Sequence, residues 1–191
     1  MVKCGYQTDV RRVQMKTKQR IPWELIKLLA YSFTFAFMIK LFIFSPFVVE
    51  GASMQPTLHN EDHLYVNKLA LHLSDVERGD VIIIKKENDP KYYVKRVVGL
   101  NGDKIEIKDG ILNVNGKPIK EDYLNNELKD EYRQYLHYDQ VTVPNNSYFV
   151  MGDNRLNSKD SRNGLDYIKE SEIVGKAQII YFPFNRLEFI Q

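Results

Sequence analysis

Residues 81–99 read VIIIKKENDPKYYVKRVVG, two apolar runs joined by a polar stretch. Residues 81–84 and 92–99 are rich in β-branched and aromatic side chains, which are typical of buried strands. Between them, residues 87–90 combine Asn, Asp and Pro, the usual composition of a turn. The pair predicts two neighbouring strands at the centre of a β-sheet.

Further short strand candidates lie on both sides of this pair. They are residues 47–50, 64–67, 104–108, 111–114, 141–143, 148–151 and 177–182. Asn115-Gly116 is the strongest hairpin signal in the chain, and Gly and Pro separate most of the other runs. Many short strands at close spacing predict a mainly β, antiparallel catalytic domain. We interpret the charged, tyrosine-rich residues 120–139 as a small inserted, exposed and partly helical excursion with solvated charges; a partner-binding site is the alternative.

A long apolar segment precedes this domain. Residues 26–44 read IKLLAYSFTFAFMIKLFIF, and as a helix they span about 28 Å, close to the thickness of the bilayer core. Residues 1–20 carry six Lys and Arg side chains against the single acid Asp9, a pattern typical of a cytoplasmic flank. We therefore expect one transmembrane helix in the cell membrane, with the amino terminus in the cytoplasm. A buried core helix is the alternative.

These observations predict a domain order. Residues 1–25 form a basic cytoplasmic tail, residues 26–44 an anchor, and residues 45–191 an extracytoplasmic β-rich domain in which residues 100–145 form a reduced outer subdomain. A cleaved secretory signal would be cut close to residues 51–52, which would split the chain beside Ser53. An uncleaved anchor is the better interpretation.

The composition argues against a nucleic-acid partner, an intrachain disulfide and a metal site. The net charge of +2 in 191 residues does not indicate a nucleic-acid partner. Cys4 is the only cysteine, so no intrachain disulfide can form. The four histidines (His59, His63, His72 and His137) show no ligand spacing with cysteines or carboxylates, and we expect neither a metal nor a cofactor.

Residues 51–57 read GASMQPT and place Ser53 a few positions after the predicted anchor. Ser, Gly and Pro are common turn residues, so a simple turn is the first interpretation. A serine nucleophile needs a neighbouring group to take its proton. No histidine stands in a suggestive setting for that role.

Lys95 is the candidate base, because it interrupts an apolar strand. Lys95 and Arg96 must point to opposite faces of that strand. A buried Lys95 would need its pKa to fall from about 10.4 by roughly 3 pH units, about 4 kcal/mol, to be a free base near neutrality. The alternatives are that Lys95 is exposed while Arg96 lines a polar pocket, or that the strand lies at an edge.

Residues 151–162, MGDNRLNSKDSR, form a third polar stretch after a strand. Asp160 and Arg162 can make a charge-assisted pair that fixes the loop. Ser158 can then orient the lysine amine. A tight surface loop is the alternative, but it does not explain three separated polar stretches of this kind.

Together these stretches resemble the type I signal peptidases, membrane-anchored Ser/Lys proteases. The matching stretches are residues 53–57, 79–81, 93–99, 102–104, 152–162 and 173–176, so the resemblance covers nearly the whole chain. The single anchor and small size resemble Gram-positive members of that family. The resemblance implies an endopeptidase that removes signal peptides from exported preproteins at the bilayer.

The resemblance also implies roles for individual residues. Ser53 is the nucleophile and Lys95 the general base, while Ser158, Asp160 and Arg162 orient and brace the lysine. The oxyanion is held by the Ser53 backbone amide and a second donor, which must be backbone, as at Gly51, or water, because Gly51 stands where some members carry a serine hydroxyl. A final set lines the apolar substrate pockets that favour Ala-x-Ala sites: Phe47, Val49, Met54 and Tyr93, with Pro46.

Two other functions fit part of the pattern. A self-cleaving Ser/Lys regulator would use the same dyad, but the chain has an anchor and no DNA-binding segment. A non-enzymatic anchored β-domain that binds exported chains would need neither Ser53 nor Lys95. The sequence does not indicate an oligomeric state.

Overall fold

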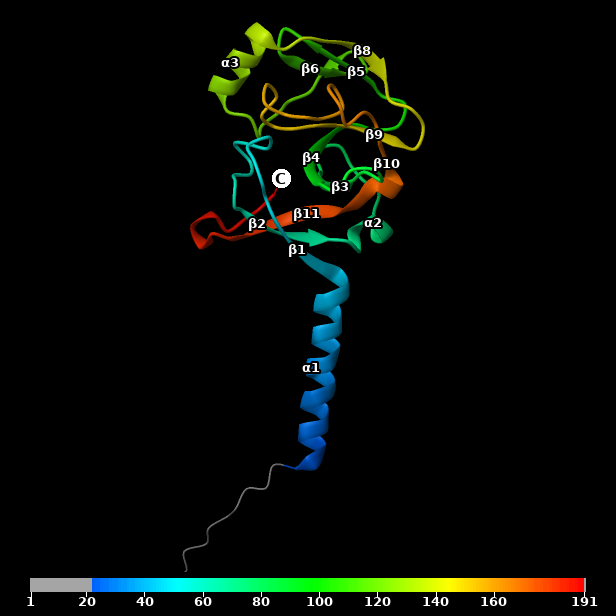
Figure 1. The fold of residues 1–191 in the computed structure, drawn as a ribbon, viewed down its shortest axis with the longest axis vertical. Helices are drawn as coiled ribbons and strands as arrows, with labels where there is room; N and C mark the ends of the chain where they lie inside the picture. The colour runs from blue at the N-terminus through cyan, green and yellow to red at the C-terminus, as the bar shows by residue number, and fades with distance from the viewer. Residues whose placement is uncertain (1–21, 191) are drawn as a thin grey trace, which may run out of the picture. The chain divides into compact units, whose positions relative to one another are not determined.

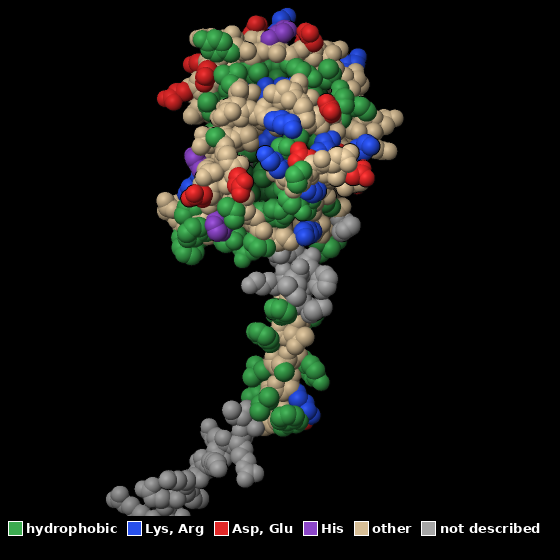
Figure 2. All heavy atoms as spheres, viewed as in Figure 1, with side chains coloured by type: hydrophobic (Ala, Val, Ile, Leu, Met, Phe, Trp, Pro, Cys, Tyr) green, Lys and Arg blue, Asp and Glu red, His purple; other side chains and the backbone are tan. Residues whose placement is uncertain are grey.

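The computed structural model describes residues 22–190, without the side chains of residues 38–44 and His72. Helix α1 (Trp23–Ile43) comes first and is followed directly by strand β1 (Phe44–Val48). Figure 2 shows that the described part of α1 carries mostly hydrophobic side chains. Among the described residues, no helix is both long and apolar enough to cross a membrane. The basic tail with Cys4, and the side chains at the end of the predicted span, lie outside the described residues.

After α1 the strands of the chain form two antiparallel sheets (Figure 1). The larger has the order β1-β2-β11-β3-β4-β9-β10, with β12 paired to β11. Its other strands are β2 (His63–Asn67), β3 (Val81–Lys85), β4 (Tyr92–Gly99), β9 (Ser147–Met151), β10 (Ile168–Lys169), β11 (Ile173–Phe182) and β12 (Glu188–Phe189). The predicted mainly antiparallel β fold is confirmed.

The smaller sheet has the order β7-β6-β5-β8. It contains β5 (Lys104–Lys108), β6 (Ile111–Val114), β7 (Lys117–Pro118) and β8 (Tyr138–Thr142). The Asn115-Gly116 turn joins β6 to β7, as the sequence predicts. This sheet falls within residues 100–145, whose separate status as an outer subdomain stays a prediction.

Short helices complete the chain: α2 (Ala70–Leu73), α3 (Asn126–Tyr135), η1 (Glu170–Glu172) and η2 (Phe184–Arg186). The first strand differs slightly from the prediction, because it covers residues 44–48 rather than 47–50. It includes Pro46, which an edge strand tolerates because proline lacks the N–H that a central strand must donate. In the sheet order β1 is indeed the edge.

The continuous apolar run of β3 is explained by burial on both faces. Val81 and Ile83 belong to one core cluster, and Ile82 and Ile84 to another. Each such side chain contributes about 1.5–3 kcal/mol by leaving water. A central strand of this kind gives its neighbour β4 a rigid support.

The prediction for residues 120–139 is confirmed for the helix and for most of the charges, since α3 is present and Glu127, Asp130 and Glu131 are exposed. It missed the buried side of the segment: Tyr132 is 1% exposed and Leu124 4% exposed, both in one core cluster. Glu121 is also buried, against Arg155. The paired charge makes the burial of the glutamate tolerable, which charge counting along the sequence could not reveal.

Candidate active site

Ser53 lies in the loop of residues 49–62, between β1 and β2, which we call the Ser53 loop. Its two ends are held together, because Val49 N donates to Asp62 O at 2.8 Å and Glu61 N donates to Val49 O at 2.9 Å. Within the loop Leu58 is fully buried and anchors it to the core. The loop therefore presents Ser53 from a fixed position.

Lys95 reaches Ser53 from strand β4. Its Nζ donates to Ser53 Oγ at 2.7 Å and to the carbonyl oxygen of Val94 at 2.8 Å. The lysine is only 2% exposed. The structure thus brings together the predicted nucleophile and the predicted base, which are 42 residues apart in the sequence.

Burial is the main influence on the charge of Lys95. It lowers the pKa from 10.5 to about 8, and the carboxylates of Asp160 and Asp153 oppose part of that shift. Water cannot solvate an ammonium group in this position, so the neutral amine is favoured relative to an exposed lysine. An appreciable fraction of Lys95 is therefore a free base near neutral pH.

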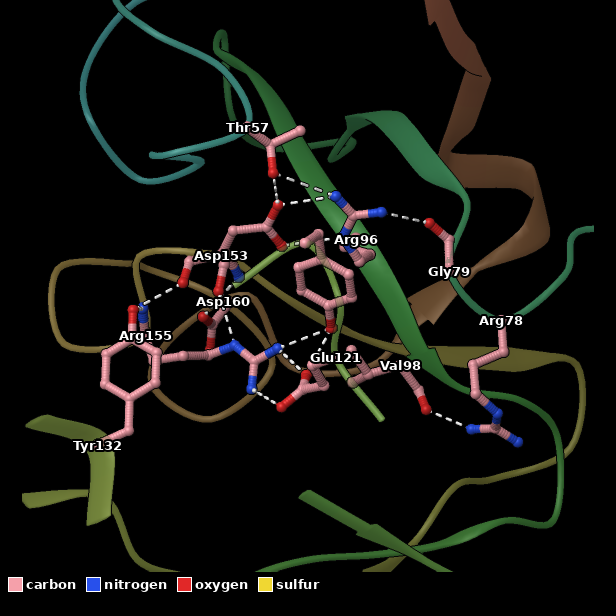
Figure 3. A network of polar contacts seen from close by, with 12 residues as sticks. Thr57, Arg78, Gly79, Arg96, Val98, Glu121, Tyr132, Asp153, Arg155 and Asp160 are labelled. Atoms are coloured by element: carbon pink, nitrogen blue, oxygen red, sulfur yellow. Dashed lines mark hydrogen bonds and ion pairs between the residues drawn. The ribbon is translucent and has the colours of Figure 1, made fainter. Parts of the chain in front are cut away.

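Arg96 is buried as well, at 1% exposure, on the other face of β4. Its Nε donates to Asp153 Oδ1 at 2.9 Å and its Nη2 to Asp153 Oδ2 at 2.8 Å (Figure 3). Asp153 also accepts a 2.6 Å hydrogen bond from Thr57 Oγ1 of the Ser53 loop. The alternative in which one of the two cations faces solvent is wrong, because β4 lies between buried surfaces on both sides.

Asp160 and Arg162 make the predicted pair. Arg162 Nε donates to Asp160 Oδ1 at 2.9 Å and Nη2 to Asp160 Oδ2 at 2.8 Å. Burial alone would raise the pKa of Asp160, but Arg162 and the Gly152 amide outweigh it and lower that pKa. The loop that follows β9 is thereby fixed around an ionised carboxylate.

The predicted role of Ser158 in orienting the lysine amine stays a prediction. Its hydroxyl is buried and makes no hydrogen bond of standard geometry among the described residues, but it lies close enough to Asp160 to help lower the pKa of that carboxyl. The lysine amine is held by the Val94 carbonyl instead. Ser158 nevertheless lies close to the site, since a Cβ on Gly152 would overlap both Ser158 Oγ and the carbonyl oxygen of Ser53. A glycine is required there because the two loops approach each other so closely.

The backbone around Ser53 has a defined orientation. The Ala52 carbonyl accepts from Gln55 N at 3.2 Å and from Asn154 Nδ2 at 3.2 Å. Because a trans peptide points its C=O and N–H in opposite directions, the Ser53 N–H points away from Asn154. It has no intramolecular acceptor among the described residues. This amide is free to donate to a substrate oxygen.

The Gly51 amide is not free in the same way. Gly51 N donates to Asn60 Oδ1 at 2.9 Å, and its φ of +95° suits glycine. The expected pair of backbone donors is therefore reduced to Ser53 in this structure. The sequence could not show that a side chain nine residues later would occupy the second amide.

The predicted apolar pocket residues are only partly brought together. Phe47, Val49 and Met54 pack in one cluster, in which Met54 is 1% and Val49 5% exposed. Tyr93 packs in a different cluster, and its hydroxyl donates to Asp89 at 2.6 Å. A hollow of about 900 Å³ lies elsewhere, beside α2 and η1. The volume of a surface pocket therefore does not identify the Ser53 site.

Comparison with known proteins places the chain in a family. The model of the family "Signal peptidase, peptidase S26" matches residues 22–182. The chain belongs to this signal peptidase family. It is 42% identical over 175 residues to Signal peptidase I of Bacillus amyloliquefaciens, covering 90% of this chain and 91% of that protein. It is 40% identical over 181 residues to Signal peptidase I T of Bacillus subtilis strain 168, covering 93% of each.

A solved structure is also similar in part. The crystal structure of a signal peptidase I from Enterococcus faecalis V583 is 29% identical, with a TM-score of 0.47, and covers 54% of this chain and 97% of that one.

Some residues around the site of this signal peptidase family member were not predicted from the sequence. Asp153 joins β4 to the Ser53 loop, and Asn154 holds that loop through Ser53 O as well as Ala52 O. Arg155 is fully paired with Glu121, and Tyr132 donates to Asp153 O at 2.7 Å (Figure 3). The density of polar residues at 152–162 signalled a structured loop, but not its partners.

Proposed function

We propose that the chain is a membrane-anchored serine endopeptidase that cleaves signal peptides from exported preproteins with Ser53 and Lys95. Its membership of the signal peptidase family supports the substrate and the reaction class. The observation that carries the catalytic assignment is the 2.7 Å contact between Lys95 Nζ and Ser53 Oγ, made by a buried lysine.

The reaction proceeds by acyl transfer. Neutral Lys95 accepts the proton of Ser53 Oγ while the oxygen attacks the scissile carbonyl, and the Ser53 N–H donates to the oxyanion. The Lys95 ammonium then protonates the leaving amine as the peptide C–N bond breaks. Water, deprotonated by the same lysine, hydrolyses the ester and restores the serine.

Asp160, Arg162 and Ser158 brace this site rather than react. Asp160 is one of the two carboxylates whose charge acts on Lys95, and the Arg162 pair holds it in place. Ser158 needs only a rotation of its unpartnered hydroxyl to bond a neighbouring group during the reaction. The site needs no metal or cofactor for these steps.

The residues before the cut are small and apolar, as in Ala-x-Ala. Phe47 and Val49, next to the Ser53 loop, and Met54 within it supply an apolar wall. Tyr93 shares a strand face with Lys95, two residues away. An extended substrate can add its backbone to the sheet edge beside these groups.

Residues 26–44 anchor the domain in the cell membrane. The described part of α1 leaves large apolar side chains exposed, among them Tyr31 at 72%, Phe33 at 75% and Phe35 at 70%. Such a surface is unfavourable in water and suits lipid. With the basic residues of 1–20 in the cytoplasm, residues 45–191 lie outside.

The test is cleavage of a purified preprotein by the full chain in detergent micelles. Ser53→Ala and Lys95→Ala should each lower the rate by at least about a thousandfold, as expected when a nucleophile or its base is removed. Lys108→Ala, an exposed lysine on β5, should cleave like the wild type. Rapid cleavage by either dyad variant would show that the assignment is wrong, and binding without cleavage by the wild type would indicate a non-enzymatic module.

A further inference from the structure

A polar groove adjoins the Ser53 loop on the side of helix α3. It has a volume of about 320 Å³. The loop contributes Gln55, Pro56 and His59, and α3 contributes Glu127, Leu128 and Glu131. In Figure 1 the loop, drawn in cyan, lies between the labels of β1 and α3. The groove is therefore bounded by the loop and α3, and the residues that line it include none from β1.

The groove begins within one or two residues of the nucleophile. Gln55 N donates to Ala52 O, and Asn154, which also lines the groove, bonds both Ala52 O and Ser53 O. A polypeptide cut at Ser53 must extend in both directions from this point. The apolar wall of Phe47 and Val49 is at the β1 end of the loop, which leaves the groove for the other direction.

The charge of the groove selects the type of side chain. Glu127 and Glu131 are one helical turn apart, both are exposed, and neither has an ion pair or a hydrogen bond from its side chain among the described residues. His59 is the other titratable group of the lining. By contrast, Asp130 is neutralised by Arg133 at 2.8 Å and does not line the groove. The two unpaired carboxylates therefore line a groove that a peptide can enter.

We propose that this groove binds the first residues after the scissile bond and favours a lysine or arginine among them. The proposal rests on the proposed peptidase function and adds a preference on the leaving side of the cut. An extended chain advances about 3.3 Å per residue, so basic side chains placed at the second to the sixth residue after the bond would test successive positions along the groove.

The experiment compares preprotein substrates that differ at one position. A single Lys, Gln or Glu is placed in turn at the second to sixth residues after the bond, and each substrate is cleaved by the full chain in micelles. At low salt kcat/KM for the best Lys substrate should exceed that of the Glu substrate by about threefold or more, and the ratio should shrink at high salt. The ratio is taken within one enzyme preparation, so differences in folded fraction cancel.

Matched variants of α3 assign the effect. Glu127→Gln/Glu131→Gln should bring the Lys-to-Glu ratio close to 1, and Glu131→Lys should favour the Glu substrate. Asp130→Asn, which removes one negative charge from the position next to Glu131, should keep the wild-type ratio. An unchanged ratio in the double variant, or a lysine effect only at positions before the bond, would overturn the groove while leaving Ser53-dependent cleavage intact. If the wild type cuts no substrate, the proposed function fails and the groove proposal fails with it.

Discussion

At the scale of single residues, the proposed mechanism depends on the protonation of Lys95. The buried amine donates to Ser53 Oγ at 2.7 Å and has its pKa lowered to about 8. Only the neutral form can accept the serine proton, so kcat/KM should rise about tenfold per pH unit up to pH 8 and then level off. At pH 6 the rate constant should be about 100-fold below the plateau.

The profile should be measured on the full chain in micelles with a preprotein substrate whose own charges lie far from the cut. A single ionisation near pH 8 supports Lys95 as the base of the free enzyme. An inflection near 6.5, where an ordinary histidine titrates, would contradict it.

Asn154 orients the backbone amide of Ser53, the proposed nucleophile. Its Nδ2 fixes the Ala52 carbonyl and thereby the direction of the Ser53 N–H on the same peptide plane. Asn154→Ala should lower kcat by about tenfold and leave KM within about twofold, because the lost orientation affects the oxyanion more than the bound substrate. A peptide aldehyde, whose adduct with Ser53 carries an oxyanion, should bind less tightly by a similar factor.

Asn157 offers the matched control in the same loop. It is exposed, and among the described residues its side chain makes no hydrogen bond, while its backbone N donates to Asn154 O at 3.1 Å. Asn157→Ala should keep both kcat and aldehyde binding. If Asn154→Ala instead raised KM alone, its role would be substrate binding and not orientation of the amide.

At the scale of secondary-structure elements, strand β4 joins two buried sites through adjacent residues. Lys95 contacts Ser53, while Arg96 pairs with Asp153, which in turn bonds Thr57. Asp153→Ala would leave the Arg96 guanidinium buried without its carboxylate and should destabilise the fold by about 3–5 kcal/mol. Urea unfolding followed by circular dichroism measures this change.

A double-mutant cycle separates the pair from the packing around it. The double variant Arg96→Met/Asp153→Ala should lose clearly less unfolding free energy than the two single variants together, because it removes both members of the buried ion pair at once. Additive losses would show that the two side chains contribute independently.

The elements that could be predicted from the sequence are those with a strong local pattern. The bounds of β4, β5 and β6 match the predicted residues 92–99, 104–108 and 111–114, because β-branched runs and turn residues specify strands locally. The same alternation predicted opposite faces for Lys95 and Arg96. Helix α3 was less predictable, since its burial depends on Tyr132 bonding Asp153, which lies 21 residues further along the chain.

At the scale of the whole molecule, the site is assembled from parts that local patterns cannot connect. Asn154 bonds Ala52 across 102 residues and Asp153 bonds Thr57 across 96. Polar composition marked all three stretches, but the occupied Gly51 amide and the unpartnered Ser158 hydroxyl depend on side-chain positions set by the folded chain. Sequence reasoning could therefore bring Ser53 and Lys95 to one site more reliably than it could name the groups that hold them.

The free energy of unfolding also belongs to the whole molecule, and Lys95 should reduce it. Its pKa falls from 10.5 to about 8 on folding, which corresponds to about 3 kcal/mol. Well below pH 8 the amine is protonated in both states, so the folded state carries the full cost of the buried cation. Between pH 8 and 10.5 the folded state loses the proton first, so stability gained from this group rises with pH.

Lys95→Met tests this linkage, because methionine fills a similar volume without a charge. The unfolding free energy of the wild type minus that of the variant should increase by about 3 kcal/mol between pH 7 and pH 10.5. All other titrating groups are common to both proteins and cancel in the difference, as does any constant loss of the hydrogen bonds to Ser53 and Val94. Urea unfolding at several pH values provides the measurement. A difference that does not vary with pH would mean that Lys95 is solvated in the folded protein, and the same result would remove the physical basis for its action as a base near neutrality.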